Sequence, residues 1–146
     1  MPVTVVELVQ RPSDDVLQAF ARLLPQLTDP PPRLTLADLE AMIAAPGTFV
    51  LVARDADHRI VGSVTLLCHR IPSGFRGRIE SLVVDEGARG KGVGRALCLA
   101  AIEHATRVGV TMVDLTSSHS RVAANALYQS LGFERRASNV YRYRIG

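Results

Sequence analysis

The sequence predicts a single α/β domain of the mixed (α+β) kind, with one mostly antiparallel sheet and helices on both of its faces. The chain has 146 residues, which is the size of one domain. Hydrophobic residues make up 47% of it and charged residues 21%, as in an ordinary globular protein. Apolar segments with a period of two alternate with segments of helical period. We therefore expect one domain over residues 1–146.

The first half of the chain reads as short elements joined by stiff loops, because all eight prolines lie at or before Pro72. Two helices are expected here, one capped by Ser13 or Asp14 and one begun by Thr35 and closed by Pro46-Gly47. Four strands are expected in this half, over residues 3–9, 48–54, 60–70 and 78–84. The last three form an antiparallel meander.

The second half, which lacks proline, reads as uninterrupted regular structure. Helices are expected over 93–108 and 121–131, and strands over 111–116, 133–137 and 140–145. The whole pattern gives about seven strands and about four helices. A meander followed by a strand–helix–strand crossover predicts a mixed sheet with helices on both faces.

Charge and composition narrow the class of partner. The formal net charge is +3, and the only lysine is Lys91, so arginine supplies nearly all the basic groups. Aromatic residues are 5% of the chain and tryptophan is absent, which is poor provision for stacking nucleic-acid bases. A small anionic ligand fits this balance better than a nucleic acid does.

Other classes are excluded by what the sequence lacks. No apolar run reaches the roughly 18 residues of a membrane helix, and residues 1–12 do not resemble a secretory signal. The two cysteines, Cys68 and Cys98, are too few for a disulfide framework. No pair of histidines has metal-ligand spacing. We expect a cytoplasmic protein with no metal and no membrane partner.

A glycine-rich loop is the most informative stretch. Four of the eleven glycines, at 87, 90, 92 and 94, fall between an apolar strand and an amphipathic helix. Glycine lets backbone N–H groups approach an anion, and the helix N-terminus adds its positive dipole end. Arg89, Lys91 and Arg95 add formal charge. This combination predicts a site for a phosphate or diphosphate.

Two common phosphate loops do not fit. Gly87 and Gly92 have the spacing of a P-loop, but Val93-Gly94 stand where Lys and Ser/Thr are needed. A dinucleotide fingerprint read from Gly92 would need a third glycine at Leu97.

The loop Arg89-Gly90-Lys91-Gly92-Val93-Gly94 resembles the acetyl-coenzyme A loop of the Gcn5-related N-acetyltransferases (GNAT family), [Q/R]-x-x-G-x-[G/A]. A second segment, RVAANALYQSLGF, is similar to the family's A-x-x-L-Y-x-x-x-G-F helix. Its matches are Ala124, Leu127, Tyr128, Gly132 and Phe133. The resemblance covers residues 48–146 as a coenzyme-binding core, with residues 1–47 as variable substrate-side helices.

The resemblance implies an acetyl-coenzyme A-dependent N-acetyltransferase, acting by direct attack of a primary amine in a ternary complex. It implies coenzyme contacts from one strand segment, one loop and one helix: Leu82, Val83, Val84, Arg89, Gly90, Lys91, Gly92, Val93, Gly94, Arg95, Asn125 and Tyr128. The family often has Asn where this chain has Arg121, so Asn125 is the candidate for a pantetheine or backbone contact. Arg121 is a candidate for a coenzyme phosphate.

Two residues are candidates for proton transfer. Tyr128 occupies the position of the tyrosine that protonates the leaving thiolate, with core packing as the alternative. Glu80 is the candidate base, because strand alternation places it on one face with Leu82 and Val84. A salt bridge to Arg76 or Arg78, or a water chain as the base, is the alternative. His119 is expected to be a solvated loop residue.

The acceptor is expected to be a small-molecule or peptide amine. Two arginines in the region 72–78 are compatible with an anionic acceptor, although a solvated hairpin is favoured. A non-catalytic acyl-coenzyme A sensor is the leading alternative function, with Glu80 and Tyr128 then only structural. The resemblance also implies a homodimer, with the strand pair over residues 133–145 at its interface.

Overall fold

The computed structural model describes residues 4–146. The chain divides into two compact units, an N-terminal unit that ends at Thr116 and a C-terminal unit of residues 117–146. Val3, the first residue of the first expected strand, lies outside the described residues. No helix in the described range 4–146 is long and apolar enough to cross a membrane.

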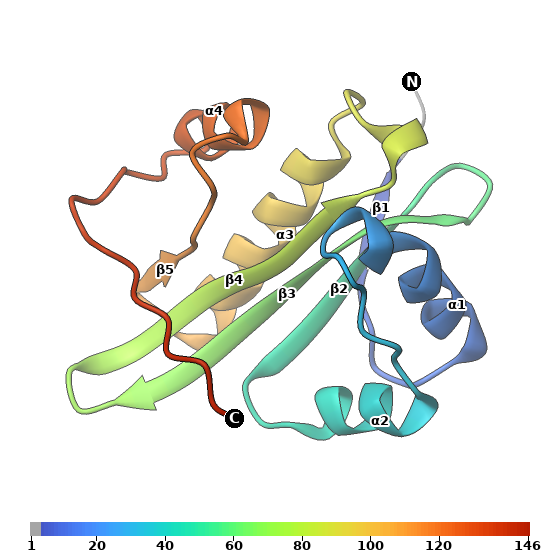
Figure 1. Ribbon diagram of the computed structural model, residues 1–146, viewed down its shortest axis with the longest axis horizontal. Coiled ribbons are helices and arrows are strands. Elements are labelled where there is room, and N and C mark those ends of the chain that lie inside the picture. Colours follow the sequence, from blue (N-terminus) through green and yellow to red (C-terminus); the bar gives the residue numbers. More distant parts are fainter. Residues whose placement is uncertain (1–3) are drawn as a thin grey trace. The chain divides into compact units, whose positions relative to one another are not determined.

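The N-terminal unit is built on one five-stranded sheet in the order β1-β2-β3-β4-β5. The strands are β1 (Val5–Leu8), β2 (Thr48–Arg54), β3 (Ile60–Ile71), β4 (Gly74–Val84) and β5 (Met112–Asp114). Neighbours pair antiparallel except β4 and β5, which pair in parallel across the crossover. The expected mixed, mostly antiparallel sheet is confirmed (Figure 1).

Local capping explains where the first two helices begin. The Ser13 hydroxyl accepts a hydrogen bond from the Val16 N–H and starts α1 (Asp14–Leu23). Thr35 and Asp38 form a reciprocal capping box that starts α2 (Leu36–Ala44). A short 3-10 turn, η1 (Leu24–Gln26), continues α1 where Pro25 interrupts it. Both expected helices are confirmed.

The sheet carries helices on both faces (Figure 1). On one face, Phe20 and Leu23 of α1 and Leu39 of α2 join a buried cluster with sheet residues. The sheet residues of this cluster are Val50, Val52, Ile60 and Val83. These shared contacts define the α1/α2 face of the sheet.

The other face is covered by α3 (Val93–Val108), with Leu97, Cys98 and Ala101 fully buried. The contact is close at Gly62 of β3. A Cβ there would lie 3.0 Å from a Leu97 methyl and 3.1 Å from a Val93 methyl. The absence of a side chain at Gly62 therefore lets the first turn of α3 pack directly on β3, which fixes where that helix begins.

The C-terminal unit contains α4 (Val122–Ser130) and no strand. The prediction of two strands over 133–137 and 140–145 is wrong, and the described residues 4–146 form five strands instead of about seven. The alternating pattern is present, but Tyr141, Tyr143 and Ile145 are each at least 88% exposed. A period-two segment forms a strand only when it finds a ladder partner, and this unit supplies none.

His104 of α3 is a titratable group packed inside the fold. Its ring lies edge-on to Phe49, with centroids 4.3 Å apart, and its Nε2 is buried without a hydrogen-bond partner. Burial, with a smaller effect from the Arg107 charge, lowers the pKa of His104 below its usual 6.5. The unfolded chain therefore takes up this proton at a higher pH than the folded chain does.

We expect the free energy of unfolding to fall as pH drops from about 7.5 to about 5, because protonation of His104 then favours the unfolded state. His104→Phe keeps the ring contact with Phe49 and removes the titrating imidazole. The free energy of unfolding of this variant should therefore fall less over the same pH interval. Urea unfolding at both pH values measures the difference. Equal losses in the two proteins would show that His104 carries no such effect.

Candidate active site

An extra residue in β4 shapes the candidate site. Thr65 of β3 pairs with Glu80, and Ser63 pairs with Val83. Two steps along β3 therefore match three steps along β4, which is a β-bulge. The bulge lies at Ser81, whose φ of 53° is in the left-handed region that non-glycine residues seldom occupy.

The bulge changes the face on which Glu80 lies. Paired residues of antiparallel strands share a face, so Glu80 shares one with Thr65, and Val83 with Ser63. This is the α1/α2 face, where Val83 is buried. Val84 pairs with Gly62 on the α3 face instead. The expectation that Glu80 shares a face with Leu82 and Val84 is therefore wrong, because strict alternation does not survive the bulge.

Glu80 is held by an arginine of its own strand. The Arg78 Nε donates to Glu80 Oε1 at 2.6 Å, and the Arg78 Nη2 donates to the Thr116 hydroxyl at 2.7 Å. The Arg78 and Glu80 side chains are 36% and 44% exposed. The salt bridge expected as the alternative for Glu80 is thus present, and it leaves the carboxylate accessible.

One edge of β4 is open beyond Arg78. Among the described strands, β5 is the neighbour on that side, and it pairs only with Arg76, Gly77 and Arg78. The backbone of residues 79–84 therefore has no strand partner on this edge within the N-terminal unit. An extended ligand with amide groups could bind there as an additional strand does.

The glycine loop follows directly from this edge. It contains a short 3-10 turn, η2 (Glu86–Ala88), and then Gly90 and Gly92 with φ of 76° and 82°. Gly92 is the N-cap of α3 and provides no side-chain cap. A Cβ on either glycine would meet nothing within 4 Å. No side chain of these two glycines covers the first-turn N–H groups of α3, an arrangement that suits an anion.

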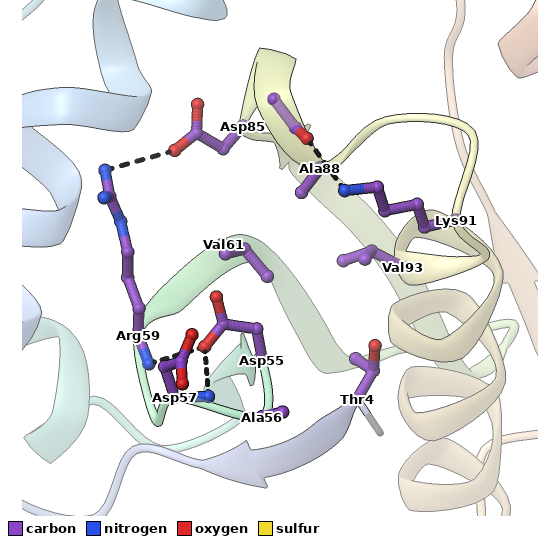
Figure 2. A pocket seen from close by; sticks show the side chains of 11 residues that line it. Thr4, Asp55, Ala56, Asp57, Arg59, Val61, Asp85, Ala88, Lys91 and Val93 are labelled. Carbon is purple, nitrogen blue, oxygen red and sulfur yellow. Dashed lines mark hydrogen bonds and ion pairs between the residues drawn. The ribbon is translucent and has the colours of Figure 1, made fainter. Parts of the chain in front are cut away.

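Basic side chains flank the loop without closing it. The Arg89 Nε donates to the Val84 carbonyl at 3.1 Å, and the Lys91 Nζ donates to the Gly87 carbonyl at 3.3 Å. A cavity of about 390 Å³ lies between this loop and the β2–β3 hairpin (Figure 2). Its lining includes Lys91 and Arg59 but also Asp55, Asp57 and Asp85. The mixed charge distinguishes it from the purely basic surroundings expected of an anion site.

Asp85 fastens the start of the loop to α1 and η1. Its carboxylate accepts from the Arg22 Nε at 3.3 Å and from the Gln26 Nε2 at 3.2 Å. The Arg59 guanidinium lies 3.8 Å away and points toward it in Figure 2. Gln26 Oε1 also accepts from the Glu86 N–H at 2.8 Å. We call Arg22, Gln26 and Asp85 the loop clamp.

The pKa of Asp85 reflects this clamp. Partial burial alone raises the pKa, but hydrogen bonds from Gln26 and Arg22 and the charges of Arg22 and Arg59 outweigh it. The net pKa is lower than the usual 3.8. The carboxylate is therefore ionised at neutral pH, as the charge-assisted bonds require.

Tyr128 and Asn125 belong to the C-terminal unit. Tyr128 is buried and lies edge-on to Phe133, with centroids 5.9 Å apart. The Asn125 Nδ2 donates to the Ser118 carbonyl at 2.9 Å, which ties the loop before α4 to the helix. Arg121 is the N-cap of α4 and provides no side-chain cap. The Asn125 side chain thus makes a hydrogen bond within its own unit.

Sequence reasoning missed the loop clamp and Thr116. Asp85 directly follows a buried strand, and a polar residue at such a position could have indicated a contact that holds the loop. Arg22 and Gln26 lie some sixty residues earlier, at separations of 63 and 59 residues from Asp85, and nothing in a linear pattern pairs them with it. Among residues 4–146, no three His, Cys, Asp or Glu side chains gather as a metal site.

Gln26→Met should loosen the loop, because it removes the acceptor of the Glu86 N–H and one bond to Asp85. We expect amide hydrogen exchange over residues 86–92 to accelerate about fivefold, the scale of roughly 1 kcal/mol of lost hydrogen bonding. Gln18→Met, the same change at an exposed position of α1, is the control and should leave this exchange unchanged. Unaltered exchange in both variants would contradict the clamp.

Comparisons with known proteins agree with this geometry. A curated mycothiol acetyltransferase from Renibacterium salmoninarum is 33% identical over 115 residues, covering 75% of this chain and 34% of that protein. The chain thus spans about a third of that relative. An acetyltransferase structure from Trypanosoma brucei is 29% identical, with a TM-score of 0.77 over 98% of this chain and all of that one.

An aminoglycoside N-acetyltransferase, solved in complex with CoA, shares the fold with a TM-score of 0.81. It is 21% identical and covers 99% of this chain and 97% of its own. The sequence model of the acetyltransferase (GNAT) family matches residues 14–133, most of the chain. These matches, together with the sheet and the glycine loop, show that the chain belongs to the GNAT acetyltransferase family.

Proposed function

We propose that this protein transfers the acetyl group of acetyl-coenzyme A to a primary amine by direct attack in a ternary complex. The observation that carries the proposal is the loop after β4. It joins an open strand edge to an uncapped helix N-terminus through two left-handed glycines. Family membership supplies the reaction class.

The coenzyme diphosphate would bind the N–H groups of Lys91, Gly92, Val93, Gly94 and Arg95. The first turn of α3 contributes its dipole, and Arg89, Lys91 and Arg95 contribute charge. Gly90 would let the loop pass close to the phosphates, since it has no side chain to displace. From there the pantetheine would run back along β4 and bond to the backbone of Leu82, Val83 and Val84 on the open edge.

This direction of binding sets the reaction site. The diphosphate loop follows the end of β4, so the thioester would lie toward the bulge, near Glu80 and Ser81. Glu80 would accept the proton that an ammonium group must lose before its nitrogen can attack. In the resulting step a C–N bond forms at the thioester carbonyl and the C–S bond breaks. The departing sulfur takes the electron pair.

The departing thiolate needs a proton, and we assign its donor to the Tyr128 phenol. An unperturbed phenol has a pKa near 10, close enough to that of a thiol, about 8.5, for efficient transfer. The second proton of the amine leaves as the tetrahedral intermediate collapses and restores the Tyr128 phenol. The products are an amide, coenzyme A with a free thiol and one proton, which leaves from Glu80 to solvent, so atoms and charge balance.

Gly92→Asp should weaken acetyl-coenzyme A binding by about 100-fold or more, because it places a carboxylate where the diphosphate would bind. Aspartate tolerates the left-handed conformation of Gly92 better than most residues do, so α3 should persist. Gly109→Asp is the matched control, since Gly109 also has a positive φ and open space, but at the C-terminus of α3. Titration calorimetry measures both. Equal affinity in the two variants would remove the loop from the binding site.

Tyr128→Phe should lower kcat by about 100-fold, the scale of lost acid catalysis, with coenzyme affinity nearly unchanged. The edge-on contact with Phe133 does not need the hydroxyl, so the fold should be retained. Tyr143→Phe, at a 90% exposed position, is the control. Release of coenzyme A thiol from a panel of amines gives the rate. Turnover equal to wild type would exclude Tyr128 as the acid.

The same assay tests the proposal as a whole. Acetyl-coenzyme A binding together with turnover of at least one amine supports an enzyme. Tight binding without turnover of any amine would instead support the acyl-coenzyme A sensor.

A further inference from the structure

The two arginines of the region 72–78 lie on a strand rather than in a loop. β4 begins at Gly74, so both Arg76 and Arg78 are within it. Arg78 pairs with Leu67, and Glu80 pairs with Thr65 two positions along β3. Arg78 and Glu80 therefore project from the same α1/α2 face of the sheet, as neighbours on that face.

Arg78 is oriented by two contacts. Its Nε donates a hydrogen bond to Glu80 Oε1 at 2.6 Å. Its Nη2 donates one at 2.7 Å to the hydroxyl of Thr116, which follows β5 in the chain. Within residues 4–146, Glu80 Oε2 and Arg78 Nη1 make no hydrogen bond. One oxygen of a carboxylate and one donor of a guanidinium are thus available side by side.

This pair is complementary to a zwitterion. The Glu80 carboxylate suits an ammonium group, and a guanidinium such as that of Arg78 suits a carboxylate. A half-exposed ion pair of this kind contributes little to the stability of the fold, so stability is a weak reason for its presence. The neighbouring Arg76 does not compete, because its Nη2 donates to the Ser73 carbonyl at the hairpin turn.

The order of the two groups along β4 also matters. In the proposed function, the thioester lies near the bulge at Ser81, so Glu80 is the nearer group and Arg78 the farther. Two residues of a strand span about 7 Å. An acceptor whose amine reaches Glu80 would therefore have Arg78 within reach of a substituent on the carbon that bears the amine.

We propose that the acceptor is a free α-amino acid, bound with its ammonium group at Glu80 and its α-carboxylate at Arg78. This inference rests on the proposed function and adds to it the chemical class of the acceptor. Arg78 recognises a part of the substrate that does not react, which makes it a specificity residue. The side chain of the amino acid would extend away from β4.

The experiment compares amines that differ only in the carboxylate. Each common amino acid is first assayed by thiol release, and the best is then compared with its amide and its decarboxylated amine. For leucine these are leucinamide and isoamylamine. The amide is less basic than the amino acid and the amine more basic, so a preference for the amino acid over both cannot come from amine protonation. We expect kcat/KM to be about 10- to 100-fold higher for the amino acid.

Arg78→Gln tests the assigned contact. It should lower kcat/KM for the amino acid about 10- to 100-fold more than for the decarboxylated amine, mainly through KM, while any loss common to both substrates reports the bond that Arg78 makes to Glu80. Arg78→Lys should restore part of the loss, since it keeps the charge. Arg76→Gln is the matched control from the same strand and face, and it should leave both substrates unchanged.

Failure of this inference can be told from failure of the proposed function. If amines without a carboxylate react as well as the amino acid, the acceptor class is wrong and acetyl transfer stands. If Arg78→Gln slows both substrates equally, Arg78 acts through Glu80, and the proposed recognition is also wrong. If no amine reacts although acetyl-coenzyme A binds, the proposed function fails and this inference fails with it.

Discussion

The extra residue in β4, accommodated with Ser81 in left-handed backbone, decides which side chains face which side of the sheet. Before the bulge, Glu80 and Arg78 face α1 and α2. After it, Val83 still fills the core on that face, although an unbroken strand would have turned it toward α3. Strain of this kind persists only where the surrounding pairs fix it, and pairs on both sides of Ser81 do so.

The end of β4 then controls the glycine loop. Gly62 lets α3 begin close against β3, and the loop clamp holds residues 85 and 86 against α1 and η1. Between these two fixed ends, Gly90 and Gly92 take left-handed conformations that expose the N–H groups of the first helical turn. The positive helix end and three basic side chains favour an anion there. The proposed anion site is thus a consequence of packing at both ends of the loop.

The helix boundaries and the glycine loop were predictable from local sequence patterns. The caps at Ser13 and Thr35 and the end of α3 at Gly109 are read from single residues, and the structure confirms them. The glycine loop was found because its chemistry is contained in six consecutive residues. The bulge was not found from the sequence, because nothing in the residues around Ser81 marks it. Only the pairing register between β3 and β4 reveals the extra residue. The loop clamp joins residues far apart in the sequence, and long-range side-chain bonds leave no periodic trace.

The prediction of two strands after α4 was wrong for a different reason. Alternation at Tyr141, Tyr143 and Ile145 satisfies the sequence rule, but a strand also needs backbone partners, which the C-terminal unit does not provide. Likewise, alternation alone assigned Glu80 to the wrong face. In both cases the alternating pattern was present in the sequence, but the structure depends on backbone pairing between strands, which the pattern does not report.

Backbone amide NMR of the protein titrated with acetyl-coenzyme A would locate the bound coenzyme on the chain. We expect saturable shifts that are largest at Lys91–Arg95, where the diphosphate would bind, and at residues 82–84, along the open edge of β4. Saturable binding whose largest shifts fall outside both segments, or an unchanged spectrum at high ligand concentration, would contradict it.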